Sequence, residues 1–254
     1  MQTSTTRSKK ILKSFGVAFF WLAVWQVLAI CVQSEILVPT PALVLKTWAG
    51  LVVSIDFWKA CAFSLLRITA GFLLSCFIGV SLGVVCECIP FFGTLLSPIL
   101  HIIRATPVIS FIILALVWIR TDYVPVFISF LMVVPILYAA TQTGLRSVDR
   151  NLLEMARVFR MKTKTVMKTI YLPTVLPILL SQGTVGLGFA WKSGIAAEVI
   201  CLPLLSIGLQ LKNAKAHIET PAVFAWTATI ILLSLLLEWL LRCLSRRYEG
   251  RWHV

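Results

Sequence analysis

Charged side chains are scarce in this sequence. Only 13% of its 254 residues are Asp, Glu, Lys or Arg, whereas 59% are hydrophobic and the mean hydropathy is +0.94. A soluble globular domain carries about 25% charged residues, so roughly half of the charge that a water-facing surface needs is missing. The composition therefore excludes an ordinary soluble domain and predicts a protein that is largely surrounded by lipid.

Histidines are scarcer still, and this bears on catalysis. The chain has three, His101, His217 and His253, and each stands apart from the others. No HExxH sequence is present, so the pattern of a zinc metalloprotease is missing. We expect no catalytic residues, no metal and no cofactor, and we expect His101 to be structural.

A phosphate-binding loop is also missing. Gly183 and Gly188 have the spacing of its two glycines, but Phe189 and Ala190 stand where Lys and Ser or Thr are required. We therefore expect that the chain is not an enzyme and that any ATP hydrolysis is supplied by a separate polypeptide.

Long apolar runs are abundant instead. A membrane-spanning helix needs about 20 predominantly apolar residues. Six stretches meet this requirement, roughly 14–33, 60–86, 94–119, 124–144, 174–200 and 221–242. The predicted fold class is an all-α polytopic membrane protein with about six transmembrane helices. In the second stretch, Ser75, Gly79 and Gly83 form a stripe of small residues that favours close helix packing.

The 23 basic residues orient these spans. They lie between the apolar runs, a pattern typical of membrane proteins rather than of nucleic-acid binding. If the N-terminus is inside, fifteen of them fall in cytoplasmic segments and five in external ones. Both termini are therefore expected in the cytoplasm. The expected organisation is a cytoplasmic tail (1–13), a retained N-terminal transmembrane helix (14–36), an external amphipathic segment (37–59), a core domain (60–242) and a second cytoplasmic tail (243–254).

The loop 145–172 is the longest polar segment and carries the strongest pattern. Asp149 is a suitable N-cap for a helix that begins at Arg150. Thr165 is expected to start a second short helix, which ends at the Leu172–Pro173 step. One face of the first helix would present the apolar residues Leu152, Met155, Ala156 and Phe159. Such a ridge fits a groove of a cytoplasmic partner; the alternative is an amphipathic linker that rests on anionic lipid.

The order of residues in this loop resembles the EAA motif of type I ABC importer permeases. Met155 replaces the first Ala of that motif and Arg160 replaces its turn glycine, so we expect the loop to bend differently here. The residues that stand at matching places are Glu154, Ala156, Arg157, Ile170, Leu172 and Pro173.

From about Leu37 to Arg247 the chain resembles the nitrate/sulfonate/taurine branch of these permeases. The segments that carry the likeness are VPTP at 38–41, SLLRITAGF at 64–72, the Gly79–Gly83 pair, RATP at 104–107, GLRSVD at 144–149 and AWKSGIAAE at 190–198. The resemblance implies a MetI-like transmembrane domain with a cytoplasmic coupling helix, in the inner membrane of a bacterial cell. It also implies a second permease subunit (an identical copy or a close paralogue), two cytoplasmic ATPase subunits and an extracytoplasmic substrate-binding protein. The ATPase-coupling residues would be Leu152, Glu154, Met155, Ala156, Arg157, Phe159, Arg160 and Met161.

Ionisable residues inside the spans are candidates for the translocation path, because a charge in the membrane is costly and usually faces a cavity or a partner. A cation at Lys192 would suit an anionic solute; the alternative is that Lys192 pairs with a carboxylate of another span or of the second subunit. Pro107 could open a kink beside Arg104. Arg67 is expected to be a structural or interfacial anchor, since its stem can extend outward. The path candidates are Arg104, Thr106, Trp191, Lys192, Ser193 and Glu198, the last of which could instead be a structural or gating contact.

The expected function is that of the permease subunit of an ATP-driven importer for a small anionic organic solute, similar to a sulfonate, nitrate or taurine. One alternative is an ion channel, because Thr184–Gly188 resembles a potassium-channel filter, although it lies in an uninterrupted apolar run. The other is a secondary transporter, a class often built from internal repeats, of which the sequence has no convincing example.

Overall fold

The computed structural model describes residues 3–249, and all regular elements in this part of the chain are helical. The chain divides into two compact units, one made of residues 1–58 and 210–230 and the other of residues 59–209 and 231–254. Helix α11 (Thr220–Glu249) contributes to both units.

The first unit contains α1 (Thr3–Val32), α2 (Pro41–Val53), most of α10 (Ile207–Ala216) and the start of α11. Helix α2 begins where the sequence dictates, because the hydroxyl of Thr40 accepts the N–H of Leu43 and a proline occupies the first position. Aromatic side chains hold the unit together: Trp25 donates to the carbonyl of Pro39 at 3.1 Å, and the rings of Phe57 and Trp226 lie 5.0 Å apart.

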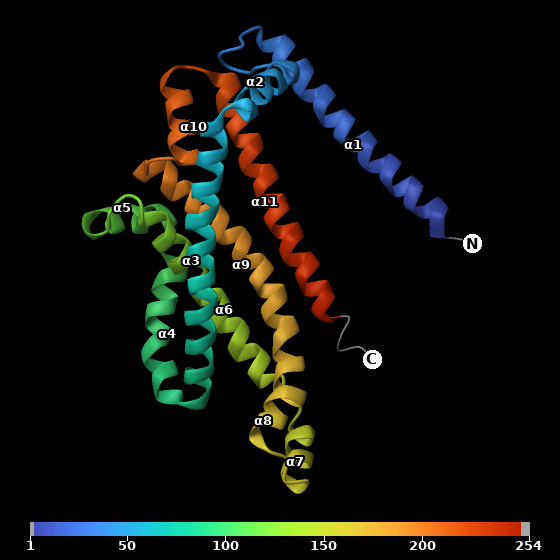
Figure 1. Cartoon of the computed structure of the whole chain (residues 1–254), viewed down its shortest axis with the longest axis vertical. Coiled ribbons are helices and arrows are strands. Elements are labelled where there is room, and N and C mark those ends of the chain that lie inside the picture. Colours follow the sequence, from blue (N-terminus) through green and yellow to red (C-terminus); the bar gives the residue numbers. More distant parts are fainter. Residues whose placement is uncertain (1–2, 250–254) are drawn as a thin grey trace. The chain divides into compact units, whose positions relative to one another are not determined.

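The second unit is built around α3 (Ile55–Cys88), α6 (Val124–Arg146) and α9 (Leu172–Cys201). Helices α6 and α9 pack along each other (Figure 1), and the Ser129 hydroxyl donates to the carbonyl of Ala190 at 3.0 Å between them. The small-residue stripe of α3 packs against α6, as predicted: a Cβ on Gly83 would meet the Thr141 side chain at 2.5 Å.

The stretch 94–119 was expected to form one span, but it is not a single continuous helix. The chain forms α4 (Pro90–Ala105) and α5 (Val108–Trp118), which meet at an angle of 109°. Thr106 is extended, as a residue before proline prefers, and Pro107 cannot donate the hydrogen bond that would continue the helix. The kink expected at Pro107 is therefore a sharp break, and Figure 1 shows α5 running across the direction of α4.

Four helices in the described residues are long and apolar enough to cross a membrane, and the bent pair α4–α5 could form a fifth span. The four run over Ile55–Cys88, Val124–Arg146, Thr163–Cys201 and Thr220–Cys243. The remaining predicted span falls in α1, whose segment Phe19–Val32 is a shorter apolar helix. The chain is thus an all-α membrane protein, as the sequence predicted.

Candidate functional site

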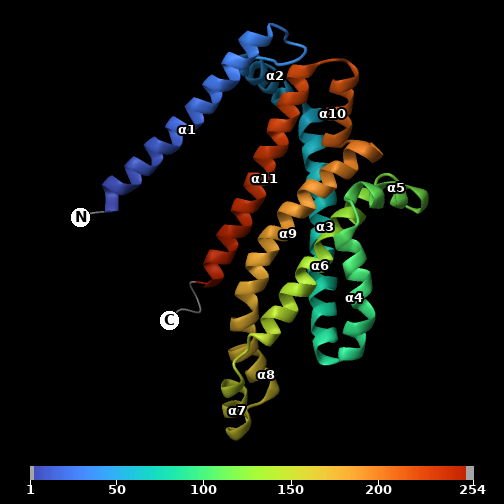
Figure 2. The same cartoon turned by 180° about the vertical axis from the view of Figure 1, so that it is seen from behind.

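A helical hairpin, residues 149–171, connects the ends of α6 and α9 and extends beyond both helices (Figure 2). Its first helix, α7 (Arg150–Val158), begins as predicted, because the carboxylate of Asp149 accepts the N–H of Asn151 at 2.9 Å. The second helix, α8 (Thr163–Val166), leads towards α9.

The turn between α7 and α8 keeps the geometry that a glycine usually supports. Arg160 has a φ of 48°, which lies in the left-handed region. The N–H of Met161 donates to the carbonyl of Ala156 at 2.9 Å, and that of Arg160 donates to Arg157 at 3.0 Å. These two bonds are the pair found when a helix ends with a left-handed residue. The expectation that Arg160 bends the loop differently is therefore wrong.

The hairpin buries a small core of its own and presents apolar side chains outward. Val148, Ala156 and Ile170 form that core, and Met161 packs against it. Of the eight predicted coupling residues, Ala156 and Met161 thus face inward. The other six are exposed: Leu152, Glu154, Met155, Arg157, Phe159 and Arg160. The exposed apolar residues of α7 and its C-cap are Leu152, Met155, Val158 and Phe159, and we call them the apolar ridge.

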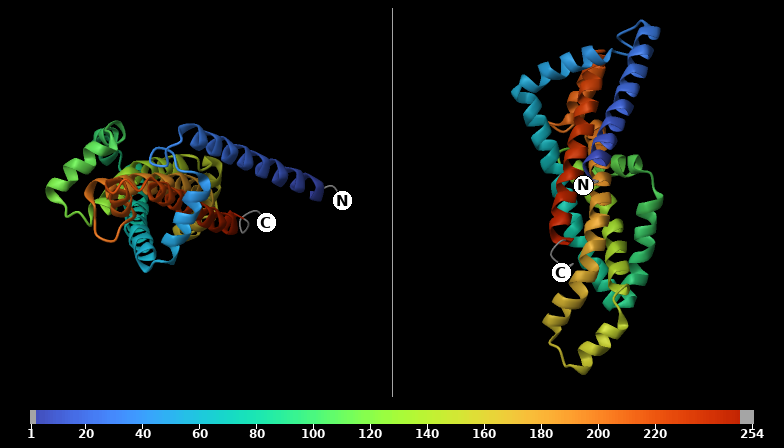
Figure 3. Two further views of the ribbon diagram at one scale, coloured as in Figure 1. Left: turned by 90° about the horizontal axis from the view of Figure 1, so that it is seen from above. Right: turned by 90° about the vertical axis from the view of Figure 1, so that its right-hand side faces the viewer.

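The predicted end of the second helix at Pro173 is wrong. A π-helical turn, Met167–Tyr171, joins α8 to α9, and the N–H of Leu172 donates to the carbonyl of Met167, five residues earlier. Pro173 falls in the first turn of α9, where a missing N–H is tolerated. The hairpin is thus joined to the long span by continuous helix, seen in the right-hand view of Figure 3.

The predicted path residues on α9 differ in how exposed their side chains are. Trp191 is 1% exposed and Ser193 is buried, with its hydroxyl bonded to the carbonyl of Phe189 at 2.8 Å. Lys192 is exposed, and within the described residues it has no hydrogen bond or ion pair. A partner carboxylate for Lys192 is therefore not supplied by the described part of its own chain.

Glu198 is fully buried near the end of α9 and forms the centre of a polar cluster. The Ser64 hydroxyl donates to its Oε2 at 2.7 Å, and the N–H of Gly208 donates to the same oxygen at 3.3 Å. Its Oε1 has no hydrogen bond and lies 3.7 Å from Nη1 of Arg67. We call these four residues the Glu198 cluster.

Arg67 is held from several sides, as expected for a structural anchor. Its guanidinium donates to the carbonyls of Leu204 at 2.8 Å and Leu205 at 3.3 Å, and it lies 3.6 Å from Asp122. Leu202 and Leu205 have left-handed backbones, so the chain turns tightly between α9 and α10. The Glu198 cluster fastens this turn to α3.

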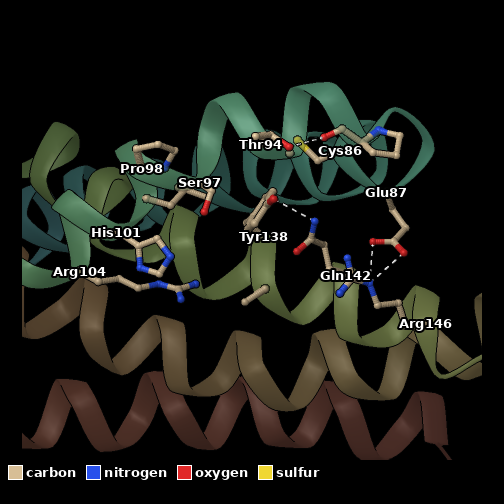
Figure 4. A pocket seen from close by; sticks show the side chains of 14 residues that line it. Cys86, Glu87, Thr94, Ser97, Pro98, His101, Arg104, Tyr138, Gln142 and Arg146 are labelled. Atoms are coloured by element: carbon tan, nitrogen blue, oxygen red, sulfur yellow. Dashed lines mark hydrogen bonds and ion pairs between the residues drawn. The ribbon is translucent and has the colours of Figure 1, made fainter.

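A cavity of about 660 Å³ lies among the end of α3, α4 and α6 (Figure 4). Among its lining residues, Arg104 was predicted as a path residue, whereas Thr106, Trp191, Lys192, Ser193 and Glu198 do not line it. We call it the polar cavity; its polar lining residues are Glu87, Thr94, Ser97, His101, Arg104, Tyr138, Gln142 and Arg146.

The charges of the polar cavity are separated along its length. His101 and Arg104 lie side by side at one end in Figure 4, and Arg104 donates to the carbonyl of Pro135 at 2.6 Å. At the other end, Nε of Arg146 donates to both carboxylate oxygens of Glu87, at 2.9 and 3.0 Å. Between the two ends, the amide of Gln142 donates to the Tyr138 hydroxyl at 2.9 Å.

His101 was expected to be structural and instead lies exposed in the wall of the polar cavity. A signal for this cavity exists in the sequence. Thr94, Ser97, His101 and Arg104 recur at intervals of three, four and three residues, which places polar groups on one face of an otherwise apolar helix.

Comparison with known proteins adds independent information. The profile of the family described as "binding-protein-dependent transport system inner membrane component" matches residues 76–250. A probable ABC transporter permease of Brucella melitensis is 31% identical over 185 residues, which cover 72% of this chain and 75% of the relative. The taurine transport system permease protein TauC of Escherichia coli is 27% identical over 253 residues, 97% of this chain and 91% of TauC. The putative aliphatic sulfonates transport permease protein SsuC of Bacillus subtilis is 28% identical over 239 residues, 90% of this chain and 86% of SsuC.

Solved structures share the fold at low sequence identity. A chain of the inward-facing MetNI methionine ABC transporter superimposes with a TM-score of 0.57 and 17% identity, over 78% of this chain and 94% of that chain. A chain of an amino acid ABC transporter solved with histidines gives a TM-score of 0.55 and 18% identity, over 82% of this chain and 96% of that chain.

Proposed function

The chain belongs to the family of binding-protein-dependent transport system inner membrane components, in the nitrate/sulfonate/taurine branch of ABC permeases, and on this premise we propose that it forms the translocation path for a small anionic organic solute. An external binding protein delivers the solute, and two separate ATPase subunits drive its import. A second permease subunit, identical or closely related, completes the path in the bacterial inner membrane, with both termini in the cytoplasm.

The observation that carries this proposal is the α7–α8 hairpin. It exposes an apolar ridge in which Val158 is 79% and Phe159 is 73% exposed, next to the charged Glu154 and Arg157. Large apolar side chains surrounded by charge are typical of a site that inserts into a groove of another protein. Continuous helix from α8 into α9 would transmit a movement of the hairpin directly to a span.

An anionic solute is supported by the relatives and by the charges of this chain. The names of two relatives refer to taurine and to aliphatic sulfonates. Two cations inside the apolar segments, Arg104 and Lys192, are exposed. Because exposed charge is costly against lipid, each of these cations should face either water in a path or the second subunit.

Phe159→Ala tests the coupling role. If Phe159 inserts into an ATPase groove, its loss should weaken the binding of the ATPase to the permease by about tenfold or more, since a buried aromatic anchor typically contributes 2 kcal/mol or more. The measurement is the dissociation constant between the purified permease in nanodiscs and the ATPase encoded beside it.

Phe77→Ala is the matched control, because Phe77 on α3 is 74% exposed and lies outside the hairpin. It should leave ATPase binding unchanged. Equal affinities for the wild type and Phe159→Ala would contradict the coupling role. Solute uptake by the permease alone in liposomes, without ATP or partner subunits, would contradict the importer function and favour a channel or a secondary transporter.

A further inference from the structure

The polar cavity is an unusual feature for a chain with so little charge. Its α4 wall carries Thr94, Ser97, His101 and Arg104, which occupy one face of the helix. Ten residues separate the first from the last, or about 15 Å along the helix at 1.5 Å per residue. The polar groups thus form a continuous strip rather than a single isolated contact.

The strip ends at Arg104, a cation that internal contacts do not neutralise, and at the neighbouring His101. Arg104 donates one hydrogen bond, to the carbonyl of Pro135, and no carboxylate lies within ion-pair distance of it in the described part of the chain. His101 has no hydrogen bond or ion pair there either. A guanidinium carries five N–H donors in a fixed fork that matches the oxygens of a carboxylate or sulfonate. Most donors of Arg104 are therefore available to a ligand in the cavity.

The opposite end of the cavity is already occupied by an internal anion. Glu87 accepts two hydrogen bonds from Arg146, whose side chain remains 66% exposed. Arg146 is thus neutralised within the chain, whereas Arg104 is not. The difference leaves one preferred position for an incoming anion, next to Arg104 and His101.

We propose that the polar cavity binds the acid group of a small solute anion, a sulfonate or carboxylate, through Arg104 and His101, and that Glu87 restricts the site by occupying Arg146. The assignment rests on the proposed function, since the bound anion is the transported solute. The hydroxyls of Ser97 and Thr94 and the amide of Gln142 supply further hydrogen bonds along the cavity wall.

The test measures binding of butane-1-sulfonate to the full chain in phosphatidylcholine nanodiscs. The neutral, nearly isosteric butane-1-sulfonamide serves as the comparison ligand. Apparent dissociation constants come from the shift of the thermal-unfolding midpoint over a concentration series, because a ligand that binds the folded state stabilises it. The wild type should bind the sulfonate and not the sulfonamide.

Two variants should change the affinity in opposite directions. Arg104→Gln should weaken sulfonate binding by about tenfold or more, the usual effect of losing a hydrogen bond to a charged group. Glu87→Gln should strengthen it by about threefold, because an exposed ion pair is weak and its removal frees Arg146 for the anion. A merely structural role for Glu87 would not produce a gain in affinity.

Arg120→Gln is the matched control, since Arg120 is exposed in the connection between α5 and α6 and does not line the cavity. It should bind the sulfonate like the wild type. Arg104→Lys, which keeps the charge without the fork, should give an intermediate affinity and replaces the glutamine variant if that variant fails to fold.

Equal affinity in the wild type and Arg104→Gln, or a loss of affinity in Glu87→Gln, overturns the proposal. If sulfonate binding is lost when half of the lipid is phosphatidylglycerol, the cavity binds a phospholipid head group. This outcome overturns the assignment of the cavity to the transported solute. These outcomes are separate from the importer function, which is tested by ATP-dependent uptake: uptake that persists in Arg104→Gln without any change in sulfonate binding would reject the anion site alone.

Discussion

Two charged regions of the larger unit show opposite solutions to placing charge in an apolar fold. In the Glu198 cluster, a fully buried carboxylate and a guanidinium with an 11% exposed side chain are surrounded by a hydroxyl, an N–H and two carbonyls. In the polar cavity, the cations are exposed, and Arg104 has a single hydrogen bond to a carbonyl. Both arginines lie within apolar runs of the sequence, and their surroundings in the fold show how far each charge is neutralised.

The difference separates structural charge from charge that is available to a ligand. Arg67 donates to Leu204 and Leu205 and lies close to Glu198 and Asp122, so its charge serves the chain itself. Arg104 retains free donors in a cavity large enough for a small molecule. Substitutions in the first region should therefore reduce stability, and those in the second should mainly alter binding.

Glu198→Ala should have the largest effect. It removes one of the two carboxylates next to the nearly buried guanidinium of Arg67, together with the acceptor for Ser64, so we expect a loss of about 3 kcal/mol in the free energy of unfolding. Denaturation in mixed detergent micelles measures the change. Glu87→Ala is the control from the polar cavity; it breaks an exposed ion pair and should cost less than about 1 kcal/mol. Equal losses in the two variants would remove the distinction between the regions.

Gly208→Ala should have the next largest effect. A Cβ at this position would overlap the backbone of Glu198, and backbone cannot move aside as a flexible side chain can. We expect a loss of about 2 kcal/mol in the free energy of unfolding, typical of overpacking a tight site. A Cβ on Gly183, in the same unit, would meet no atom within 4 Å, so Gly183→Ala is the control. A Gly208→Ala protein as stable as wild type would show that the turn is not fastened as described.

Arg160→Gly should have the smallest effect and the opposite sign. Arg160 holds a left-handed backbone, which costs a residue with a side chain roughly 1 kcal/mol and costs glycine almost nothing. We expect the variant to gain up to about 1 kcal/mol in stability, measured in the same way. Arg157→Gly, at a helical position of α7, should instead destabilise the hairpin by a similar amount. A destabilised Arg160→Gly protein would indicate that the Arg160 side chain makes a contribution larger than the strain.

Local rules predicted the parts of the fold that depend on near neighbours. Asp149 caps α7 because its carboxylate reaches an N–H only two residues away. The stripe of Ser75, Gly79 and Gly83 faces α6 because helical periodicity places these residues on one side. The sharp break at Pro107 and the π-turn before Pro173 were underestimated, because a proline marks where a helix is disturbed and not how far the chain then turns.

The candidate site was predicted less completely. Arg104 was identified as an ionisable residue inside an apolar run, but His101, Glu87 and Arg146 were not assigned to the path, since they come from three different helices. The coupling residues were identified from their resemblance to a family motif, while the inward positions of Ala156 and Met161 depend on how the hairpin closes.

The sequence by itself determined that this protein is embedded in a membrane, because a chain with 13% charged residues cannot cover a water-facing surface. It also determined which cations are out of place, since a charge within an apolar run stands out without reference to any fold. Only the tertiary structure decided what each of those cations does. Whether a charge is neutralised or free depends on carbonyls, hydroxyls and carboxylates brought by distant segments, such as the 204–208 turn around Arg67 and the α6 wall beside Arg104.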